Sequence, residues 1–198
     1  MPIRNRLFSR LFLALAVATL ALQTLVAHQE LGGSFPATLW RMSGYFTVLS
    51  LLALIAALVA ETLGRRPSPR LTGAIALAML IVTTLYHLVL ARVWSFEGLA
   101  WWTDHAVHSV IPALTLIWWL LRRGRRPGLA DLPAWLAWPA GYLVVMMLRG
   151  LATGFWPYPF LDPGRSGWPG FAANLAGLLA VALCLALTLM TLRRILGR

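Results

Sequence analysis

The sequence has no lysine, a single cysteine and few charged side chains of any kind. Charged residues make up 12% of its 198 residues, against about a quarter in a soluble domain, and 60% of the residues are apolar. This composition excludes an ordinary soluble domain and a disordered chain. Because Cys184 stands alone, neither an intrachain disulfide nor a cysteine-ligated metal site can form.

Six apolar runs are each long enough to cross a bilayer as a helix, which takes about 20 residues. The runs are continuous and show no alternation of period two, which favours helices over barrel strands. The sequence therefore predicts an all-α, polytopic bundle of six transmembrane helices that forms one integral membrane domain over residues 1–198. The predicted spans lie near 7–27, 40–63, 71–93, 101–121, 132–152 and 168–192.

The first run has a second interpretation. Arg4, Arg6 and Arg10 precede an apolar stretch that ends in Leu25-Val26-Ala27, a pattern that resembles a secretory signal peptide. The run is long for such a peptide and its cleavage site is poor. We therefore expect a retained helix.

The arginines divide unequally between the two ends of the predicted helices. Thirteen of the 17 lie before the first span, between the second and third, between the fourth and fifth, or after the sixth. Only Arg41, Arg92, Arg149 and Arg165 lie at the other end. The positive-inside rule then predicts a multi-pass protein of the inner (plasma) membrane with both termini in the cytoplasm. Orientation and attraction to anionic lipid account for the net charge of +11, so we expect no nucleic-acid partner.

Five predicted helices each carry one hydrogen-bonding side chain at a similar depth. Counted from the outer tryptophans at about 1.5 Å per residue, each lies ~10 Å inside the outer end of its helix. The five are Thr47, His87, His108, Arg149 and Asn174. Because polar groups inside a bilayer are costly, the layer predicts one of two things. It is either a cavity around which the five meet, or a structural network that joins the helices.

Some of these side chains also have simple structural interpretations. Thr47 can donate to a carbonyl of its own helix, and Asp104 or Thr103 can cap the helix that begins there. Arg149 can reach the interface on its long stem. His105 lies close enough to the interface to be hydrated.

The absence of common catalytic and nucleotide-binding motifs limits the kinds of reaction that this chain can catalyse. The sequence has no glycine-flanked serine nucleophile, P-loop, dinucleotide fingerprint or His-Glu-x-x-His pair. His105 and His108, with Asp104 or His87, form a thin ligand set, and we expect no metal. His87 and His108 on adjacent helices also suit axial ligation of haem, so a haem-binding electron-transfer protein is one alternative. The other chemistry is a hydroxyl nucleophile with a histidine base, and Thr47 and His108 at matched depth fit it.

In this hydrolytic scheme, Asp104 lies one turn before His108 and orients it. An oxyanion or a substrate carboxylate needs a polar partner, and the candidates for that partner are His87, Arg149 and Asn174. Tyr158 lies in a proline-rich outer loop near the site. A non-catalytic lipid-binding or transport bundle is a third possibility, and it predicts polar groups in both halves of the membrane or helices broken at mid-membrane.

Four segments of the chain carry a family resemblance. They are Gly32-Gly33-Ser34, Tyr45-Phe46-Thr47, the run from His105 to Pro112, and the run from Gly154 to Leu161. In this order they resemble the androgen-induced and androgen-dependent transmembrane hydrolases. Those are the FAHFA hydrolases, which cleave fatty acid esters of hydroxy fatty acids. The resemblance covers about residues 32–174, and the arginine-only, Ala- and Leu-rich composition looks like that of a bacterium with a GC-rich genome.

The resemblance implies a multi-helix membrane bundle with a catalytic threonine and histidine inside the bilayer. By position these are Thr47 and His108, and Asp104 stands where the eukaryotic members have asparagine. A lipid hydrolase that takes a fatty ester from the surrounding membrane lipid and needs no cofactor is the function that the resemblance implies.

Overall fold

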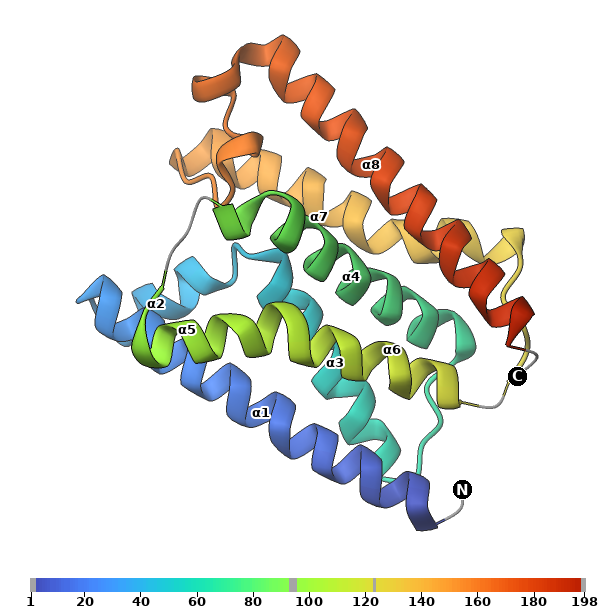
Figure 1. Cartoon of the computed structure of the whole chain (residues 1–198). Coiled ribbons are helices and arrows are strands. Elements are labelled where there is room, and N and C mark those ends of the chain that lie inside the picture. Colours follow the sequence, from blue (N-terminus) through green and yellow to red (C-terminus); the bar gives the residue numbers. More distant parts are fainter. Residues whose placement is uncertain (1–2, 93–95, 123, 197–198) are drawn as a thin grey trace.

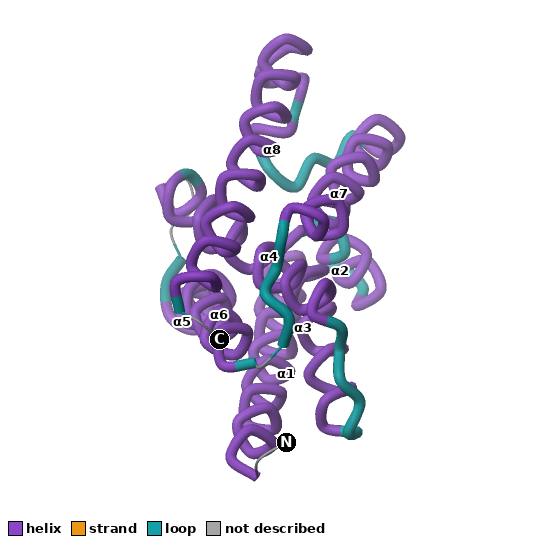
Figure 2. Tube along the Cα trace, turned by 90° about the vertical axis from the view of Figure 1, so that its right-hand side faces the viewer, coloured by secondary structure: helices purple, strands orange, loops and turns teal. Residues whose placement is uncertain are grey.

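The computed structural model describes residues 3–92, 96–122 and 124–196, and the regular structure in these ranges is helical (Figures 1 and 2). Val93, the predicted end of the third span, lies outside the described residues, as do Arg123 and Arg198, two of the thirteen arginines on the predicted cytoplasmic side. The α-helices are α1 (Ile3–Leu31), α2 (Phe35–Met42), α3 (Phe46–Thr62), α4 (Pro69–Leu88), α5 (Gly98–His105), α6 (Ile111–Leu121), α7 (Leu132–Thr153) and α8 (Pro163–Ile195). Shorter turns are η1 (Leu90–Arg92), the π-helical η2 (Ala106–Val110), η3 (Leu129–Asp131) and η4 (Pro159–Leu161).

Capping residues fix where several helices begin and end. The Ser68 hydroxyl accepts from the Leu71 N–H at 3.2 Å, and Pro69 opens α4 with the φ that a first helical turn needs. Asp162 caps α8 in the same way. The chain leaves α7 at Gly154, whose φ of 71° is left-handed and favours glycine. The connections between helices are therefore short and defined.

The structure corrects the predicted number of spans. Among the described residues it has four helices that are long and apolar enough to cross a membrane, and five if the bent pair α2 and α3 counts as one span, instead of six. The predicted span 40–63 is bent by 92° between α2 and α3. The predicted span 101–121 is divided into α5, η2 and α6. Several long apolar helices remain, and they indicate a multi-pass membrane protein.

The bend between α2 and α3 is stabilised by polar side chains of α7. Tyr142 donates to the carbonyl oxygen of Gly44 at 2.8 Å, and Arg149 donates to Ser43 Oγ at 3.0 Å and to the Trp40 carbonyl. These contacts satisfy backbone groups that a straight helix would have paired internally. The hydropathy of the run 40–63 does not report the bend, because the residues on both sides of it are apolar.

Helix α4 lies at the centre of the bundle (Figure 1) and packs against α3, α6, α7 and α8, while α1 packs along α3. Its side chains Leu77 and Met79 are almost fully buried. Helix α8 meets α7 near the chain's C-terminus and diverges from it toward its own N-terminal end (Figure 1). Both termini lie at the same end of the bundle (Figure 1).

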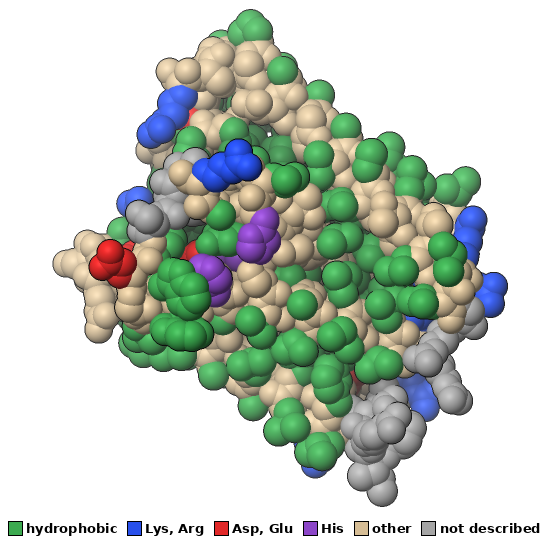
Figure 3. Space-filling view, viewed as in Figure 1, with side chains coloured by type: hydrophobic (Ala, Val, Ile, Leu, Met, Phe, Trp, Pro, Cys, Tyr) green, Lys and Arg blue, Asp and Glu red, His purple; other side chains and the backbone are tan. Residues whose placement is uncertain are grey.

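The outer surfaces of the peripheral helices are apolar. Leu11 of α1 is 62% exposed, and Val145 and Leu148 of α7 are each 59% exposed. Figure 3 shows apolar side chains spread over a broad face of the molecule, with arginine side chains gathered toward its margins. Such a surface suits contact with lipid, which imposes no penalty on exposed leucine or valine.

Candidate active site

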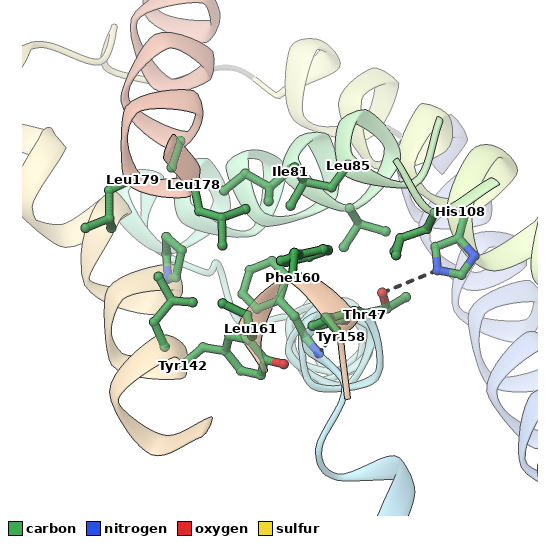
Figure 4. A pocket seen from close by; sticks show the side chains of 16 residues that line it. Thr47, Ile81, Leu85, His108, Tyr142, Tyr158, Phe160, Leu161, Leu178 and Leu179 are labelled. Carbon is green, nitrogen blue, oxygen red and sulfur yellow. Dashed lines mark hydrogen bonds between the residues drawn. The ribbon is translucent and has the colours of Figure 1, made fainter. Parts of the chain in front are cut away.

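A cavity of about 50 Å³ lies among α3, α4, α7, η4 and α8 (Figure 4). Its lining is apolar apart from four side chains, which are Thr47, His108, Tyr142 and Tyr158. Figure 4 shows Thr47 and His108 at one end of the lining and Leu178 and Leu179 of α8 at the opposite end. The end with Thr47 and His108 is therefore the most polar part of the cavity, and the rest of the lining is aliphatic and aromatic, with Tyr142 on the side away from His108.

Thr47 and His108 face each other at the polar end. Thr47 lies in the first turn of α3 and is 8% exposed, and His108 lies in η2 and is 9% exposed. Thr47 Oγ1 is 3.5 Å from His108 Nε2, at the outer limit of a hydrogen bond (Figure 4). Catalytic hydrogen bonds are often this long without substrate and shorten when it binds. The two residues that the sequence suggested as nucleophile and base are therefore brought together.

Asp104 holds the other side of the His108 ring. His108 Nδ1 lies 3.0 Å from Asp104 Oδ1 and 3.0 Å from the Asp104 carbonyl oxygen. Because both oxygens are acceptors, Nδ1 carries the ring proton in the neutral imidazole, and Nε2 presents its lone pair toward Thr47. This is the tautomer that a general base requires.

Tyr86 completes the group, and its part in it is not predicted from the sequence. Its hydroxyl donates a short hydrogen bond to Asp104 Oδ2, and its ring stacks on the His108 ring with centroids 4.2 Å apart and planes inclined by 6°. The sequence feature that could indicate a role for Tyr86 is its position directly before His87, a residue of the predicted polar layer. A tyrosine near the outer end of a span is commonly an interfacial anchor, so the position of Tyr86 alone does not indicate a role at a site.

The π-helical turn η2 sets the position of His108. Pro112 has no N–H to donate to the His108 carbonyl four residues earlier, and its ring would crowd that carbonyl in a regular helix. In η2 the Ile111 N–H donates to the Ala106 carbonyl instead, five residues earlier. The wider turn accommodates the proline and holds His108 between Asp104 and Thr47.

Tyr158 lies over the first turn of α3. The Phe46 N–H donates to the Tyr158 hydroxyl at 3.1 Å, and this helix has no side-chain N-cap of its own. Burial raises the pKa of the Tyr158 phenol to about 12, although hydrogen bonds from Thr47 and Phe46 oppose the rise. Tyr158 is therefore an uncharged hydroxyl beside Thr47, with its own proton available for donation.

The two other predicted histidines do not reach the cavity. His87 is exposed, and its Nε2 lies 2.9 Å from Ser109 Oγ. His105 Nδ1 lies 3.0 Å from the Trp101 carbonyl oxygen, and the His105 ring stacks on Trp101 at 3.9 Å. Both side chains point away from the cavity. Each leaves its helix in a different direction from the nearby residue that faces Asp104 or Thr47.

Arg149 and Asn174 also serve other contacts. Arg149 lies over the Trp40 ring at 4.1 Å and supports the bend before α3. Asn174 donates to the Phe160 carbonyl at 2.8 Å and joins α8 to η4. The expectation that Thr47, His87, His108, Arg149 and Asn174 meet around one cavity is therefore wrong, since only Thr47 and His108 line it.

The arrangement of the histidines bears on the haem and metal alternatives. Both ring nitrogens of His108 are directed at protein groups, and His87 Nε2 is directed at Ser109. His108 therefore has no uncommitted ring nitrogen to offer a haem iron shared with His87. Within residues 3–92, 96–122 and 124–196, no group of three His, Cys, Asp or Glu side chains is placed to hold a metal ion.

No protein family, no curated protein and no solved structure matches this chain.

Proposed function

We propose that this chain is a membrane-embedded carboxylic ester hydrolase with Thr47 as nucleophile and His108 as general base. The observation that carries the proposal is the line of contacts from Thr47 through His108 to Asp104, which ends at an otherwise apolar cavity. A nucleophile, a base and a group that orients the base are the parts that acyl transfer needs.

In the proposed reaction, Thr47 Oγ1 attacks the ester carbonyl carbon while His108 Nε2 takes the hydroxyl proton. The tetrahedral intermediate collapses, the C–O bond to the alcohol breaks, and His108 returns the proton to the leaving oxygen. Water then attacks the acyl-Thr47 ester with His108 again as base. The bond between the acyl carbon and Thr47 Oγ1 breaks, His108 returns the proton to Thr47 Oγ1, and the carboxylic acid leaves. Asp104 keeps the ring oriented and stabilises the imidazolium that forms in each half.

The oxyanion of each intermediate needs hydrogen-bond donors. Tyr158, an uncharged hydroxyl at the first turn of α3, is one candidate donor, and the N-terminal end of α3 adds backbone N–H groups and a partial positive charge. The Phe46 N–H donates to the Tyr158 hydroxyl in this structure. It is the backbone N–H that we propose for binding the oxyanion. This role does not fall to Arg149, Asn174 or His87, because none of them lines the cavity and each makes hydrogen bonds to other groups.

The proposed substrate is a fatty ester. Apart from the polar end, the cavity walls are mainly aliphatic and aromatic, and Leu179 of α8, which lines the cavity, is itself 39% exposed on the outer surface. An ester whose acyl chain stays in lipid can bring its carbonyl to Thr47 without entering water. The resemblance to the FAHFA hydrolases favours the same substrate class.

We also propose that both termini are cytoplasmic, that the site lies in the outer half of the membrane, and that the membrane is the bacterial inner membrane. The arginine distribution supports this orientation, and both termini lie at one end of the bundle. A C-terminal reporter fusion should give a cytoplasmic signal. An extracytoplasmic signal, repeated with a second reporter, would reverse the orientation.

The test of the chemistry uses purified full-length protein, a panel of long-chain esters and a fluorophosphonate probe. Thr47→Ala and His108→Ala should each abolish hydrolysis and probe labelling, and Thr47→Ser should keep part of both. Thr188→Ala is the control, because Thr188 is an exposed threonine that donates only to the Cys184 carbonyl. Hydrolysis and labelling that persist in Thr47→Ala would refute the assignment.

A further inference from the structure

A second cavity, of about 190 Å³, lies at the end of the bundle that carries both termini. Its walls come from the connection between α3 and α4, the connection between α6 and η3, and the C-terminal part of α8. It shares no lining residue with the candidate active site. What it binds is therefore independent of whether Thr47 is a nucleophile.

Positive charge dominates the second cavity. Four lining residues are arginines, namely Arg66, Arg122, Arg125 and Arg193. A fifth, Arg70, adjoins them by sharing Asp131 with Arg125. The carboxylates that face this group are Asp131 and Glu61, and Glu61 pairs with Arg122. Five guanidinium groups against two carboxylates leave an excess of three positive charges around one cavity.

The arginines divide into a fixed set and an open set. Arg193 is 4% exposed and donates to the carbonyls of Trp119 and Leu120, at the C-terminal end of α6, at 2.9 and 2.7 Å. Arg122 is held by Glu61 and by the Pro67 carbonyl, and burial and the charge of Arg193 lower its pKa. These two form a rigid positive wall.

Arg66 and Arg125 form the open set. Both are exposed, and Arg66 makes no hydrogen bond or ion pair with the residues that the structure describes. Arg125 shares Asp131 with Arg70, so its guanidinium has donors left over. These side chains can close over a group held against the wall.

Two further features of the lining favour an anion. Trp135 is 1% exposed, and its indole N–H has no hydrogen-bond partner among the described residues. Ser68 and Pro69 also line the cavity, so the N-terminal end of α4 opens onto it with its partial positive charge. Positive charge from the arginines and from the N-terminal end of α4 therefore surrounds the cavity, with one carboxylate in the lining.

We propose that this cavity binds a phosphate group, with Arg66 and Arg125 as its closing ligands. Its volume equals that of about six water molecules at roughly 30 Å³ each, which is enough for a tetrahedral phosphate with some of its hydration. Guanidinium forks match phosphate oxygens in pairs, which suits arginine better than lysine for this task. The phosphate belongs either to the headgroup of an anionic phospholipid or to a free phosphate ion, since the chemistry of both is the same.

The test compares the melting temperature of full-length protein in neutral detergent with three additions at constant ionic strength. Phosphatidylglycerol, phosphatidylcholine and inorganic phosphate are titrated separately. Stabilisation by phosphatidylglycerol alone assigns a lipid headgroup, and stabilisation by inorganic phosphate assigns a free ion. If neither raises the melting temperature above the phosphatidylcholine baseline, the proposal is overturned.

Neighbouring arginines provide a matched control. The double variant Arg66→Ala, Arg125→Ala should weaken the apparent affinity roughly tenfold or more, because two charge-assisted contacts are lost. Arg65→Ala, Arg126→Ala removes the same charge from exposed neighbours that do not line the cavity and should leave the affinity near wild type. Equal losses in the two double variants would show diffuse surface attraction and no site. Arg66→Ala alone, which breaks no internal contact, gives the same comparison with Arg65→Ala if the double variant folds poorly.

Discussion

The sharpest test of the proposed site is Tyr86→Phe. This change keeps the ring that stacks on His108 at 4.2 Å and removes only the hydroxyl that donates to Asp104 Oδ2. Asp104 then keeps its contact with His108 Nδ1 but loses its second side-chain partner. The substitution therefore probes whether the second hydrogen bond on the carboxylate keeps the base in position.

The size of the effect follows from the type of hydrogen bond that is lost. A hydrogen bond to a charged group contributes about 1.5–3 kcal/mol. If all of it supports the oriented base, kcat falls roughly 10- to 100-fold, because each 1.4 kcal/mol is worth about tenfold in rate. KM should change little, since Tyr86 does not line the cavity where the substrate would bind.

The assay measures kcat, KM and thermal unfolding for wild type, Tyr86→Phe and Tyr45→Phe in detergent micelles with a long-chain ester. Tyr45 is the control, because its hydroxyl makes no hydrogen bond with the described residues while its ring packs on Tyr158 at 5.9 Å. A Tyr86→Phe variant that is less stable but has the kcat of wild type would refute the reasoning. Tyr86 would then support the fold and not the base.

Three other predictions concern stability. Glu61→Gln should lower the free energy of unfolding by up to about 3 kcal/mol, because it removes the buried carboxylate that pairs with the partly exposed Arg122, and a chemical denaturation midpoint near that of wild type would contradict this. Gly73→Ala should lower the melting temperature, because the new Cβ would lie 2.2 Å from Cζ2 of Trp135, whereas Gly141→Ala, with nothing within 4 Å, should not. The raised pKa of Tyr158 contributes stability that is fully present below pH 10 and is lost as the pH rises through about 12, so Tyr158→Phe should flatten that alkaline decline in a pH titration of unfolding.

The sequence predicted the axial position of the site residues but not their direction. Counting residues from tryptophan anchors gives depth along a helix, and the spacing of Asp104 and His108 gives a shared face. Rotation about the axis is set by packing against neighbouring helices. Tyr86 and His87 are adjacent and therefore point about 100° apart, so only Tyr86 reaches Asp104 while His87 turns to Ser109.

The same limit explains Arg149 and Asn174. Their predicted depth matches that of Thr47, yet each satisfies backbone groups of a bend or turn that no hydropathy profile contains. The carbonyls that they bind exist only because the chain bends before α3 and turns at η4. A contact with an irregular backbone becomes predictable only after the irregularity itself is known.

Those irregularities lie at the candidate site, and this has a physical reason. Thr47 follows the bend between α2 and α3, and His108 lies in the π-helical turn that accommodates Pro112, so the two predicted spans that fail as straight helices supply the two residues proposed as nucleophile and base. Non-helical backbone at membrane depth needs polar partners, and a cavity can hold a reactive hydroxyl only where the backbone opens space for it. A straight α3 would continue α2 past Gly44 and would leave no free helix N-terminus beside Thr47. The departure from regular spans is therefore what makes room for Tyr158 at the first turn of α3 and turns a polar layer into a site.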